Sequence, residues 1–575
     1  MLSKIKICLS LLSEKEEKIK TSVLLVLLIA YALLEIVGIG SFPVYLLSIL
    51  KPDFLQNLMT EYSFINFNLE KYSQETILIY GGVFLVSFFV IKNIFFLLIT
   101  RFEKKFIYTL ISKKSFELYK IYHRQKYIFH LNTNPSKLIR NIDLVEDSVL
   151  YISYFLLFLR ELFVLLVTFS FLILINFEVT IFTFIFFLIS ILILFSFTKR
   201  KTKSYGQKVI DLRNFFYKII TEGMEAIKEV KILGRSRYFS NLFRENTKNL
   251  FYNKYKIEMI KSIPKMYLEV LAVVFMCLLF IYFFNSTKDF EIAIITLATF
   301  SVVIVRMLPS LTSISTGLAY LKSLHPSANT LINELNREAD YPSSSEPFFG
   351  SNSDPKYNIN NFSKLELKNI SYGYTAEKKI INNFSIKISN NKIFGIRGVS
   401  GSGKTTLINI ILGLLEPESG EIVIDNTTIK DFSVLQKTFG LVSQNIYLLD
   451  ETVRKNIAFG LNDSEIDDEQ VKKSARLAQA DSFINSLENG YDTIVGNKGV
   501  KISGGQMQRI GIARALYSNP KILILDESTS ALDIKNEDKI LDLIKDLKKR
   551  MAIIVISHRE STLKICDQLI DLESK

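Results

Sequence analysis

A glycine-rich stretch, GVSGSGKT at 398–405, has the residue types and the spacing that bind nucleotide phosphates. It fits the pattern G-x-x-x-x-G-K-[ST], and it lies between an apolar segment typical of a strand and a segment typical of a helix. Glycines let backbone N–H groups turn towards phosphate oxygens, and the helix adds its positive N-terminal end. The stretch predicts a site for ATP and Mg²⁺ that is formed by Gly398, Ser400, Gly401, Ser402, Gly403, Lys404, Thr405 and Thr406.

Within this site, Lys404 supplies a point charge at the β- and γ-phosphate oxygens, and Thr405 offers a hydroxyl to Mg²⁺. A later stretch, KILILDEST at 521–529, is an apolar segment that ends in two acids. Asp526 is expected to reach Mg²⁺ through water, and Glu527 is expected to polarise an attacking water as a general base. The two stretches together predict nucleotide hydrolysis.

A third stretch, SGGQ at 503–506, precedes another helical pattern and forms a second anion-binding device that a single ATP site does not need. With this motif the chain resembles the ATP-binding cassette (ABC) superfamily, whose signature it carries as ISGGQ. The resemblance implies that two chains associate head to tail, so that the signature of each closes over the ATP of its partner. The implied signature contacts are Ser503, Gly504, Gly505 and Gln506. Because both halves of the site are intact, a homodimer is favoured over a heterodimer.

Four further residues match the family's motifs one by one. Tyr374 in ISYGYT resembles the aromatic residue that stacks on adenine, and Gln444 in LVSQNIYLLD resembles the glutamine that senses Mg²⁺ and the γ-phosphate. His558 in IIVISHRES resembles the switch histidine that holds the γ-phosphate, and Asp533 in SALD resembles the D-loop aspartate. By this resemblance, Glu527, Gln444 and His558 are the catalytic residues.

The stretch TIVGNKG at 493–499 resembles an exporter-specific loop, in which Asn497 and Lys498 replace the usual Glu and Arg. The charge contact of that loop with the transmembrane helices is therefore expected to be altered.

Length and composition describe the elements that must hold these motifs. The 575 residues exceed what one core usually organises, so at least two domains are expected. Hydrophobic residues make up 49% of the chain, yet the formal net charge is +13. A nucleic-acid-binding protein is disfavoured because much of the basic excess adjoins apolar runs and no nucleic-acid motif is present. Cys8, Cys277 and Cys566 have no metal or disulfide spacing, which indicates a reducing environment for the soluble part.

Six apolar runs are each long enough to cross a hydrocarbon core of about 30 Å, which takes about 20 helical residues. They lie near 21–50, 76–100, 148–174, 179–198, 266–284 and 292–320. Lys and Arg concentrate in the loops 101–147 and 199–263, so both loops and both termini are predicted to be cytoplasmic. Each loop is expected to contain a turn and a short helix, at 132–148 and at 225–236, that either transmits force to a partner domain or is the tip of an ordinary helical hairpin. No cleavable signal peptide is expected.

Ionisable residues inside the apolar runs are costly, and they snorkel, pair with one another or face a polar cavity. They are Glu35, Lys92, the pair Arg160–Glu161, Glu269 and Arg306. Several charges in one bundle favour a polar inward cavity, so Glu35, Lys92, Arg160, Glu269 and Arg306 are candidate substrate contacts. Pro309, after Arg306, would permit a bend in the last span.

The stretches around Glu35, Glu269 and Arg306 resemble the PglK-type flippases that move lipid-linked oligosaccharides in bacterial protein glycosylation. A polyprenyl-pyrophosphate cargo needs cationic groups for its diphosphate, and Lys92, Arg160 and Arg306 are candidates. A multidrug or lipid exporter is the alternative, and the 45 phenylalanines suit it. An ATP-gated channel or regulator is a third possibility, which intact Glu527, Gln444 and His558 argue against.

The expected fold is therefore a membrane α-helical bundle of six spans, as in type I or type IV ABC exporters, fused to a P-loop α/β nucleotide-binding domain. The boundaries are 1–325 for the transmembrane domain, 326–362 for a linker rich in Ser, Pro and Asn, and 363–575 for the ATP-binding domain. The expected location is the bacterial inner membrane.

Overall fold

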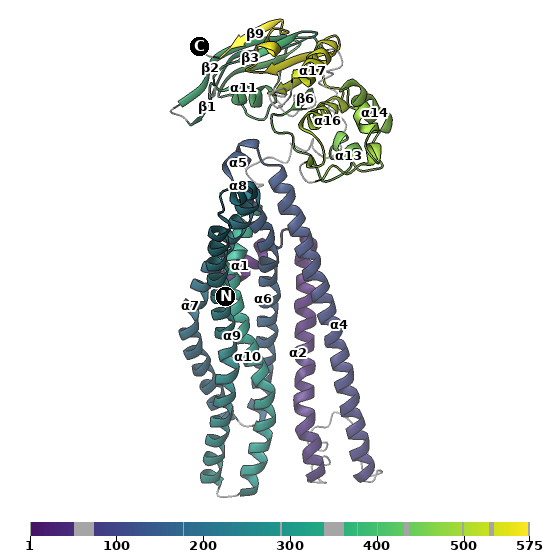
Figure 1. Cartoon of the computed structure of the whole chain (residues 1–575). Helices are drawn as coiled ribbons and strands as arrows, with labels where there is room; N and C mark the ends of the chain where they lie inside the picture. The colour runs from purple at the N-terminus through teal and green to yellow at the C-terminus, as the bar shows by residue number, and fades with distance from the viewer. Residues whose placement is uncertain are drawn as a thin grey trace. The chain divides into compact units, whose positions relative to one another are not determined.

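The structure is a computed structural model. It describes residues 2–50, 74–175, 177–287, 290–337, 362–375, 378–399, 401–429, 436, 438–496, 499–527 and 534–572. The chain forms two compact units (Figure 1). Unit 1 comprises residues 1–125 and 132–342, and unit 2 comprises residues 126–131 and 343–575.

Unit 1 is helical. Its helices are α1 (Leu2–Leu11), α2 (Lys15–Leu50), α4 (Gln74–His123), α6 (Pro135–Ile175), α7 (Phe177–Glu225), α8 (Ile227–Ile232), α9 (Ser236–Thr287) and α10 (Phe290–Leu335). The 50 residues of α4 make a rod of about 75 Å, since an α-helix rises about 1.5 Å per residue. A rod of this length exceeds the thickness of a bilayer core, so the long helices extend well beyond their apolar segments.

The six predicted spans fall inside the six long helices α2, α4, α6, α7, α9 and α10. Within the described residues, four segments are long and apolar enough to cross a membrane, at 78–123, 135–170, 177–194 and 236–282. The other two predicted spans, 21–50 and 292–320, lie in α2 and α10, where many side chains are outside the described residues.

Apolar side chains hold the helices of unit 1 together. Helix α6 packs along α10, α9 packs on both α7 and α10, and α2 packs on α4 (Figure 1). Phe275 of α9 is completely buried, and its ring contacts Phe182, Phe186 and Phe187 of α7. This aromatic cluster closes the α7–α9 interface at the level of the predicted spans.

The short helix predicted at 132–148 was wrong in its position. The short helix is α5 (Tyr127–Asn132), and residues 135–148 are the first turns of α6. The physical reason is a helix-start signal at Asn134-Pro135, where α6 begins. The Asn134 side-chain oxygen accepts a hydrogen bond from the Ser136 N–H, and proline is favoured in the first turn of a helix. In the second loop, α8 lies within the predicted range 225–236.

Unit 2 contains two sheets. The antiparallel sheet has the order β2-β1-β4-β5, and the parallel sheet has the order β6-β7-β8-β3-β9. The strands are β1 (Lys364–Thr375), β2 (Lys378–Ser389), β3 (Ile393–Arg397), β4 (Ser419–Ile424), β5 (Thr427–Thr428), β6 (Phe439–Val442), β7 (Ile522–Asp526), β8 (Ala552–Ile556) and β9 (Gln568–Asp571).

Unit 2 also contains helices. They are α11 (Lys404–Ile411), α13 (Val453–Ile457), α14 (Asp468–Leu477), α15 (Asp481–Asn485), the 3-10 helix η4 (Gly490–Asp492), α16 (Gly504–Tyr517), α17 (Ile534–Leu547) and α18 (Glu560–Leu563). Helix α16 packs on β6 of the parallel sheet, and α13 and α14 pack on α16 (Figure 1). One apolar core joins the two sheets and α11. A second core contains residues of the helices α13, α14, α15, α16 and α17 together with residues of the parallel sheet. Because β3, β7 and β8 are buried on both faces, they are almost purely apolar in sequence, as is typical of parallel strands.

Candidate ATP site

Four neighbouring parallel strands bring the predicted ATP-site residues to one edge of the sheet. The strands β6, β7, β8 and β3 are adjacent and parallel, so their carboxyl ends lie side by side. Gln444 follows β6, Glu527 follows β7, His558 follows β8, and the glycine-rich loop follows β3. In an open parallel sheet, this edge is where ligands bind.

The side chains form one chain of contacts in the same order as the strands. Gln444 Nε2 donates to Glu527 Oε2 at 2.6 Å. His558 Nε2 lies 3.2 Å from Glu527 Oε1 and 3.1 Å from Lys404 Nζ. Lys404 Nζ also donates to the carbonyl oxygen of Gly398 at 2.6 Å. Residues predicted to sense, hydrolyse and hold the nucleotide therefore lie within direct contact of one another.

Glu527 adopts an unusual backbone conformation. Its φ is +46°, in the left-handed region that costs a non-glycine residue of order 1–3 kcal/mol. Its N–H donates to the carbonyl oxygen of Ile556 at 3.0 Å, which ties the residue to the end of β8. This bond fixes the turn after β7, and the Glu527 carboxylate meets both Gln444 and His558.

Asp526, the last residue of β7, has a different environment from its neighbour. Burial raises the pKa of the Asp526 carboxyl, the negative charge of Glu527 raises it further, and Lys404 opposes both effects. The two carboxyl groups and the single ammonium group therefore leave an excess of negative charge, which a bound cation would neutralise.

The glycine-rich loop fits a phosphate group. Gly401 and Gly403 have φ of +86° and +93°, which other residues rarely adopt. A Cβ on Gly398 would lie 2.5 Å from Ser402 Oγ, so the backbone there has no room for a side chain. The Ser402 hydroxyl is buried without a partner among the described residues. No side chain caps α11, which leaves its first N–H groups for phosphate oxygens.

Three predicted residues surround this loop. The Thr405 side chain is exposed at the start of α11, where a hydroxyl can reach a cation, and Thr406 behind it is buried. Tyr374, at the end of β1, is 45% exposed, and its hydroxyl lies 3.4 Å from Thr406 Oγ1. The antiparallel sheet thus presents an aromatic face beside the glycine-rich loop. Ser400, Asp533, Asn497 and Lys498 lie outside the described residues.

The signature residues begin α16. Ser503 accepts a hydrogen bond from the Gln506 N–H, and Gln506 Oε1 accepts one from the Ser503 N–H at 2.9 Å. This capping box fixes the turn, while Ser503 and Gly504 remain exposed. A Cβ on Gly504 would meet no atom, so the surface there is open. Gly505 follows within the first turn.

In the membrane helices, the predicted substrate contacts are largely paired. Lys92 of α4 is 3% exposed, and its Nζ contacts Glu35 Oε2 of α2 at 2.7 Å. Arg160 Nε donates to Glu161 Oε1 at 2.9 Å, and its guanidinium lies 5.2 Å from the centre of the Phe96 ring. These residues join α2, α4 and α6 as a compensated cluster rather than as free cations.

The two other candidates are not part of this cluster. Glu269 is exposed on α9. Arg306 belongs to α10, but its side chain is outside the described residues.

Several residues that support the site have no role in the sequence prediction. Glu537 of α17 is buried, accepts a hydrogen bond from Ser561 Oγ at 2.5 Å and pairs with Arg559, the neighbour of His558. Arg514 of α16 binds the loop that follows Gln444. A charged residue inside the apolar run IGIARAL is the signal that could have identified Arg514.

Comparison with known proteins agrees with this geometry. Residues 381–530 match the family described as ABC transporter. An ATP-dependent lipid A-core flippase of Saccharophagus degradans is 32% identical over 368 residues, which are 62% of this chain and 58% of that relative. The putative multidrug export ATP-binding/permease protein YgaD of Bacillus subtilis is 39% identical over 213 residues, 36% of each chain. The aligned parts thus span less than two-thirds of these relatives.

The solved structure of a bacterial Atm1-family ABC exporter with ATP bound has a TM-score of 0.75 at 19% sequence identity. It covers 97% of this chain and 93% of that chain, which confirms the expected fold class. The family match implies ATP as the ligand of the site, with Mg²⁺ as its usual partner. Residues 381–530 thus match the ABC transporter family, and the chain as a whole has the fold of a bacterial Atm1-family ABC exporter.

Proposed function

We propose that this protein hydrolyses ATP to drive the export of an amphipathic substrate across the bacterial inner membrane. The observation that carries the proposal is the contact chain Gln444–Glu527–His558–Lys404 in a polypeptide that also contains apolar spans. Lys404 and the N-terminal end of α11 would hold phosphates, and Thr405 and Asp526 would hold Mg²⁺. Glu527 would accept a proton from water, while Gln444 and His558 orient the reacting groups.

The proposed active form is a homodimer with cytoplasmic termini. Ser503 and Gly504 are exposed at the start of α16, where an anion can approach the helix N-terminus. They are not among the residues that follow β3, β6, β7 and β8 at the candidate ATP site, which supports head-to-tail association with a second copy. The basic loops between the apolar runs support the orientation.

For the cargo, we favour an anionic lipid carrier, with a polyprenyl-pyrophosphate-linked oligosaccharide as the first candidate. Such a cargo moves a diphosphate and a polar glycan through the bundle while its tail stays in lipid. Charged residues inside the helices support this choice because burying them in a membrane is costly and such residues commonly mark substrate pathways. Since Lys92 and Arg160 are already paired with carboxylates, the cargo's phosphates would have to compete with Glu35 and Glu161 for them.

A multidrug or other lipid exporter is the second candidate. The similarity to a lipid A-core flippase and to a putative multidrug export protein supports it. An ATP-gated channel or regulator is disfavoured by the intact contact chain around Glu527.

The activity is tested on the full chain purified into lipid nanodiscs. We expect Mg²⁺-dependent ATP hydrolysis, and we expect Glu527→Gln to lower kcat by about 100-fold or more while ATP still binds, since a general base contributes that much. Unchanged hydrolysis in Glu527→Gln would contradict the assignment of the base. A turnover near zero in the unmodified protein would favour the channel or regulator instead.

The cargo is tested separately, in proteoliposomes that contain fluorescent lipid-linked oligosaccharide, a lipid A-like lipid or a hydrophobic cation dye. We expect ATP-dependent translocation of the lipid-linked oligosaccharide and stimulation of ATP hydrolysis by the same lipid. The Glu527→Gln protein is the matched control for passive leakage. Export of the dye without movement of either lipid would establish the multidrug alternative.

A further inference from the structure

A second arginine-centred contact set joins the signature helix to the loop that carries Gln444. Arg514 lies in the last turn of α16, the helix that begins with the signature residues. Its Nε and Nη1 donate to the carbonyl oxygens of Asn456 and Tyr447, both at 2.7 Å. Its Nη2 donates to Asn456 Oδ1 at 2.9 Å, and its guanidinium lies 4.5 Å from the centre of the Phe459 ring.

Asn456 organises the same loop from the inside. The residue is fully buried near the end of α13. Its Oδ1 accepts a hydrogen bond from the Leu449 N–H, and its Nδ2 faces the carbonyl oxygens of Leu449, Glu451 and Thr452. The segment 447–456 is therefore folded around the side-chain amide of Asn456. Arg514 donates hydrogen bonds both to that amide oxygen and to the loop backbone.

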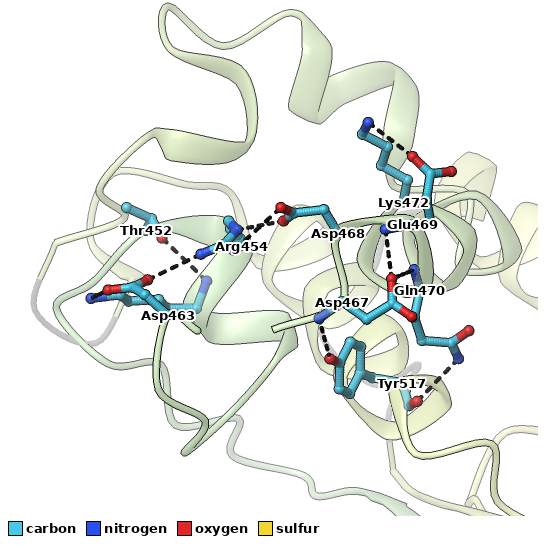
Figure 2. Close-up of polar contacts among 10 residues, drawn as sticks. Thr452, Arg454, Asp463, Asp467, Asp468, Glu469, Gln470, Lys472 and Tyr517 are labelled. Carbon is cyan, nitrogen blue, oxygen red and sulfur yellow. Dashed lines mark hydrogen bonds and ion pairs between the residues drawn. The ribbon is translucent and has the colours of Figure 1, made fainter. Parts of the chain in front are cut away.

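A separate set of charged and polar contacts also holds α13 (Figure 2). Arg454 contacts Asp463 and Asp468, and Asp468 is the first residue of α14. The Asp467 N–H donates to Tyr517 Oη, which belongs to the last turn of α16. Helix α13 is thus tied to α16 through Arg514 and to α14 through Arg454, and α14 is tied back to α16.

Stability alone does not explain an arginine at this position. Among the described residues, the four contacts of the Arg514 guanidinium are all with neutral groups. Burial lowers its pKa to about 10, which reflects the cost of placing this cation away from water. A well-packed apolar side chain can be equal to or better than a buried charge for stability. The planar guanidinium fork, by contrast, fixes the geometry of several acceptors at once.

We propose that Arg514 is a positioning residue that locks the loop after Gln444 to the signature helix. Gln444 contacts the ATP site of its own chain, and Ser503 is proposed to contact the ATP of the partner. The lock makes the two contacts form and break together, so that binding at one site prepares the other. The inference rests on the proposed ATPase homodimer.

The test compares Arg514→Met, Arg514→Lys and the control Arg476→Met in the full chain in nanodiscs. Arg476 is an exposed arginine of α14 in the same helical unit. Equilibrium ATP binding is measured in the Glu527→Gln background, and kcat, KM and the Hill coefficient of hydrolysis are measured with Glu527 present. Binding in the Glu527→Gln background does not depend on turnover, so a failure of the proposed ATPase is recognised independently.

We expect Arg514→Met to keep ATP affinity at the first site within about threefold, to lower the Hill coefficient towards one and to lower kcat about tenfold or more, by analogy with displaced catalytic groups. Arg514→Lys should recover part of the cooperativity because it keeps the charge but not the fork. Arg476→Met should behave as the unmodified protein.

Unchanged cooperativity in both Arg514 variants would overturn the inference. A loss of affinity and turnover in proportion to the unfolded fraction would overturn it too, because that outcome marks a purely structural residue. If Arg514→Met does not fold, Arg514→Lys decides between these results. Asn456→Ala is measured alone and combined with Arg514→Lys. The effects of the two substitutions on kcat and on the Hill coefficient are expected to be non-additive.

Discussion

At the residue scale, two adjacent acids at the end of β7 have separate environments and separate roles. Glu527 points to Gln444 and His558 from a left-handed backbone, whereas Asp526 keeps the conformation of the strand. Burial and the charge of Glu527 raise the pKa of Asp526, so its ionised form is disfavoured in the folded protein. A bound Mg²⁺ would reverse that preference, since a cation stabilises the carboxylate.

This pKa shift predicts a pH dependence with a definite sign. The folded protein holds a proton on Asp526 more tightly than the unfolded chain does, so ionised Asp526 opposes folding above its ordinary pKa of about 3.9. Asp526→Asn should therefore raise the melting temperature at neutral pH without nucleotide. It should also abolish the extra stabilisation that Mg²⁺ adds to ATP.

In the unmodified protein, protonation of Asp526 should weaken Mg²⁺ binding as the pH falls, beginning at a higher pH than for an ordinary aspartate. Titration calorimetry with Mg²⁺ and a non-hydrolysable ATP analogue in the unmodified protein checks this expectation, because the charge of Glu527 is itself one cause of the shift. A melting temperature that falls in Asp526→Asn would contradict the proposed environment of the carboxyl.

At the element scale, the motifs predicted the site better than the contacts that support it. Strand–loop and strand–acid patterns are local, and parallel strand order brings their ends together. These patterns are why Gly398 and Glu527 could be assigned to one site from sequence, whereas Gln444 and His558 were assigned to it through the resemblance to the ABC superfamily. The apolar runs likewise predicted the long helices, because about 20 apolar residues in succession have few other structures.

The partners of buried charges could not be predicted in the same way. Lys92 and Glu35 are 57 residues apart, and only the packing of α2 on α4 brings them together. The position of α5 was also missed, because the N-cap at Asn134 and the proline at 135 decide where α6 begins. Which charges become partners depends on how the helices pack against one another, and this packing cannot be read from a single sequence.

The Lys92–Glu35 pair predicts how α2 and α4 respond to mutation. Glu35→Gln leaves a buried ammonium without its counter-ion, which typically costs about 3–5 kcal/mol, and Lys92→Met alone leaves a buried carboxylate. Replacing both by Glu35→Leu and Lys92→Met removes both charges and should restore most of the stability. Thermal unfolding in nanodiscs measures the three variants. Single variants that unfold like the unmodified protein would show that the pair is not buried in this way.

At the scale of the whole molecule, a six-residue segment between α4 and α6 belongs to unit 2, the unit that contains the candidate ATP site. Residues 126–131 cluster with unit 2, although the helices on both sides of them belong to unit 1. Ile128 packs against the core that joins the two sheets and α11, and Lys126 Nζ contacts Glu416 Oε2 at 3.0 Å. Since exposed ion pairs contribute little, Ile128 is the stronger of the two attachments.

This attachment predicts that Ile128→Asp separates ATP hydrolysis from cargo. The substitution places a charge on an apolar surface, so α5 should detach while the contact chain from Gln444 to Lys404, which lies elsewhere in unit 2, stays intact. Hydrolysis without cargo should persist within about threefold, whereas stimulation by the transported lipid and translocation in proteoliposomes should fall about tenfold or more, as for a displaced catalytic group. Ile139→Asp, at an exposed position of α6, is the matched control and should keep both activities.

Normal stimulation in Ile128→Asp would mean that force reaches the membrane helices by another route. Equal loss of basal and stimulated hydrolysis would mean that Ile128 supports the nucleotide site itself.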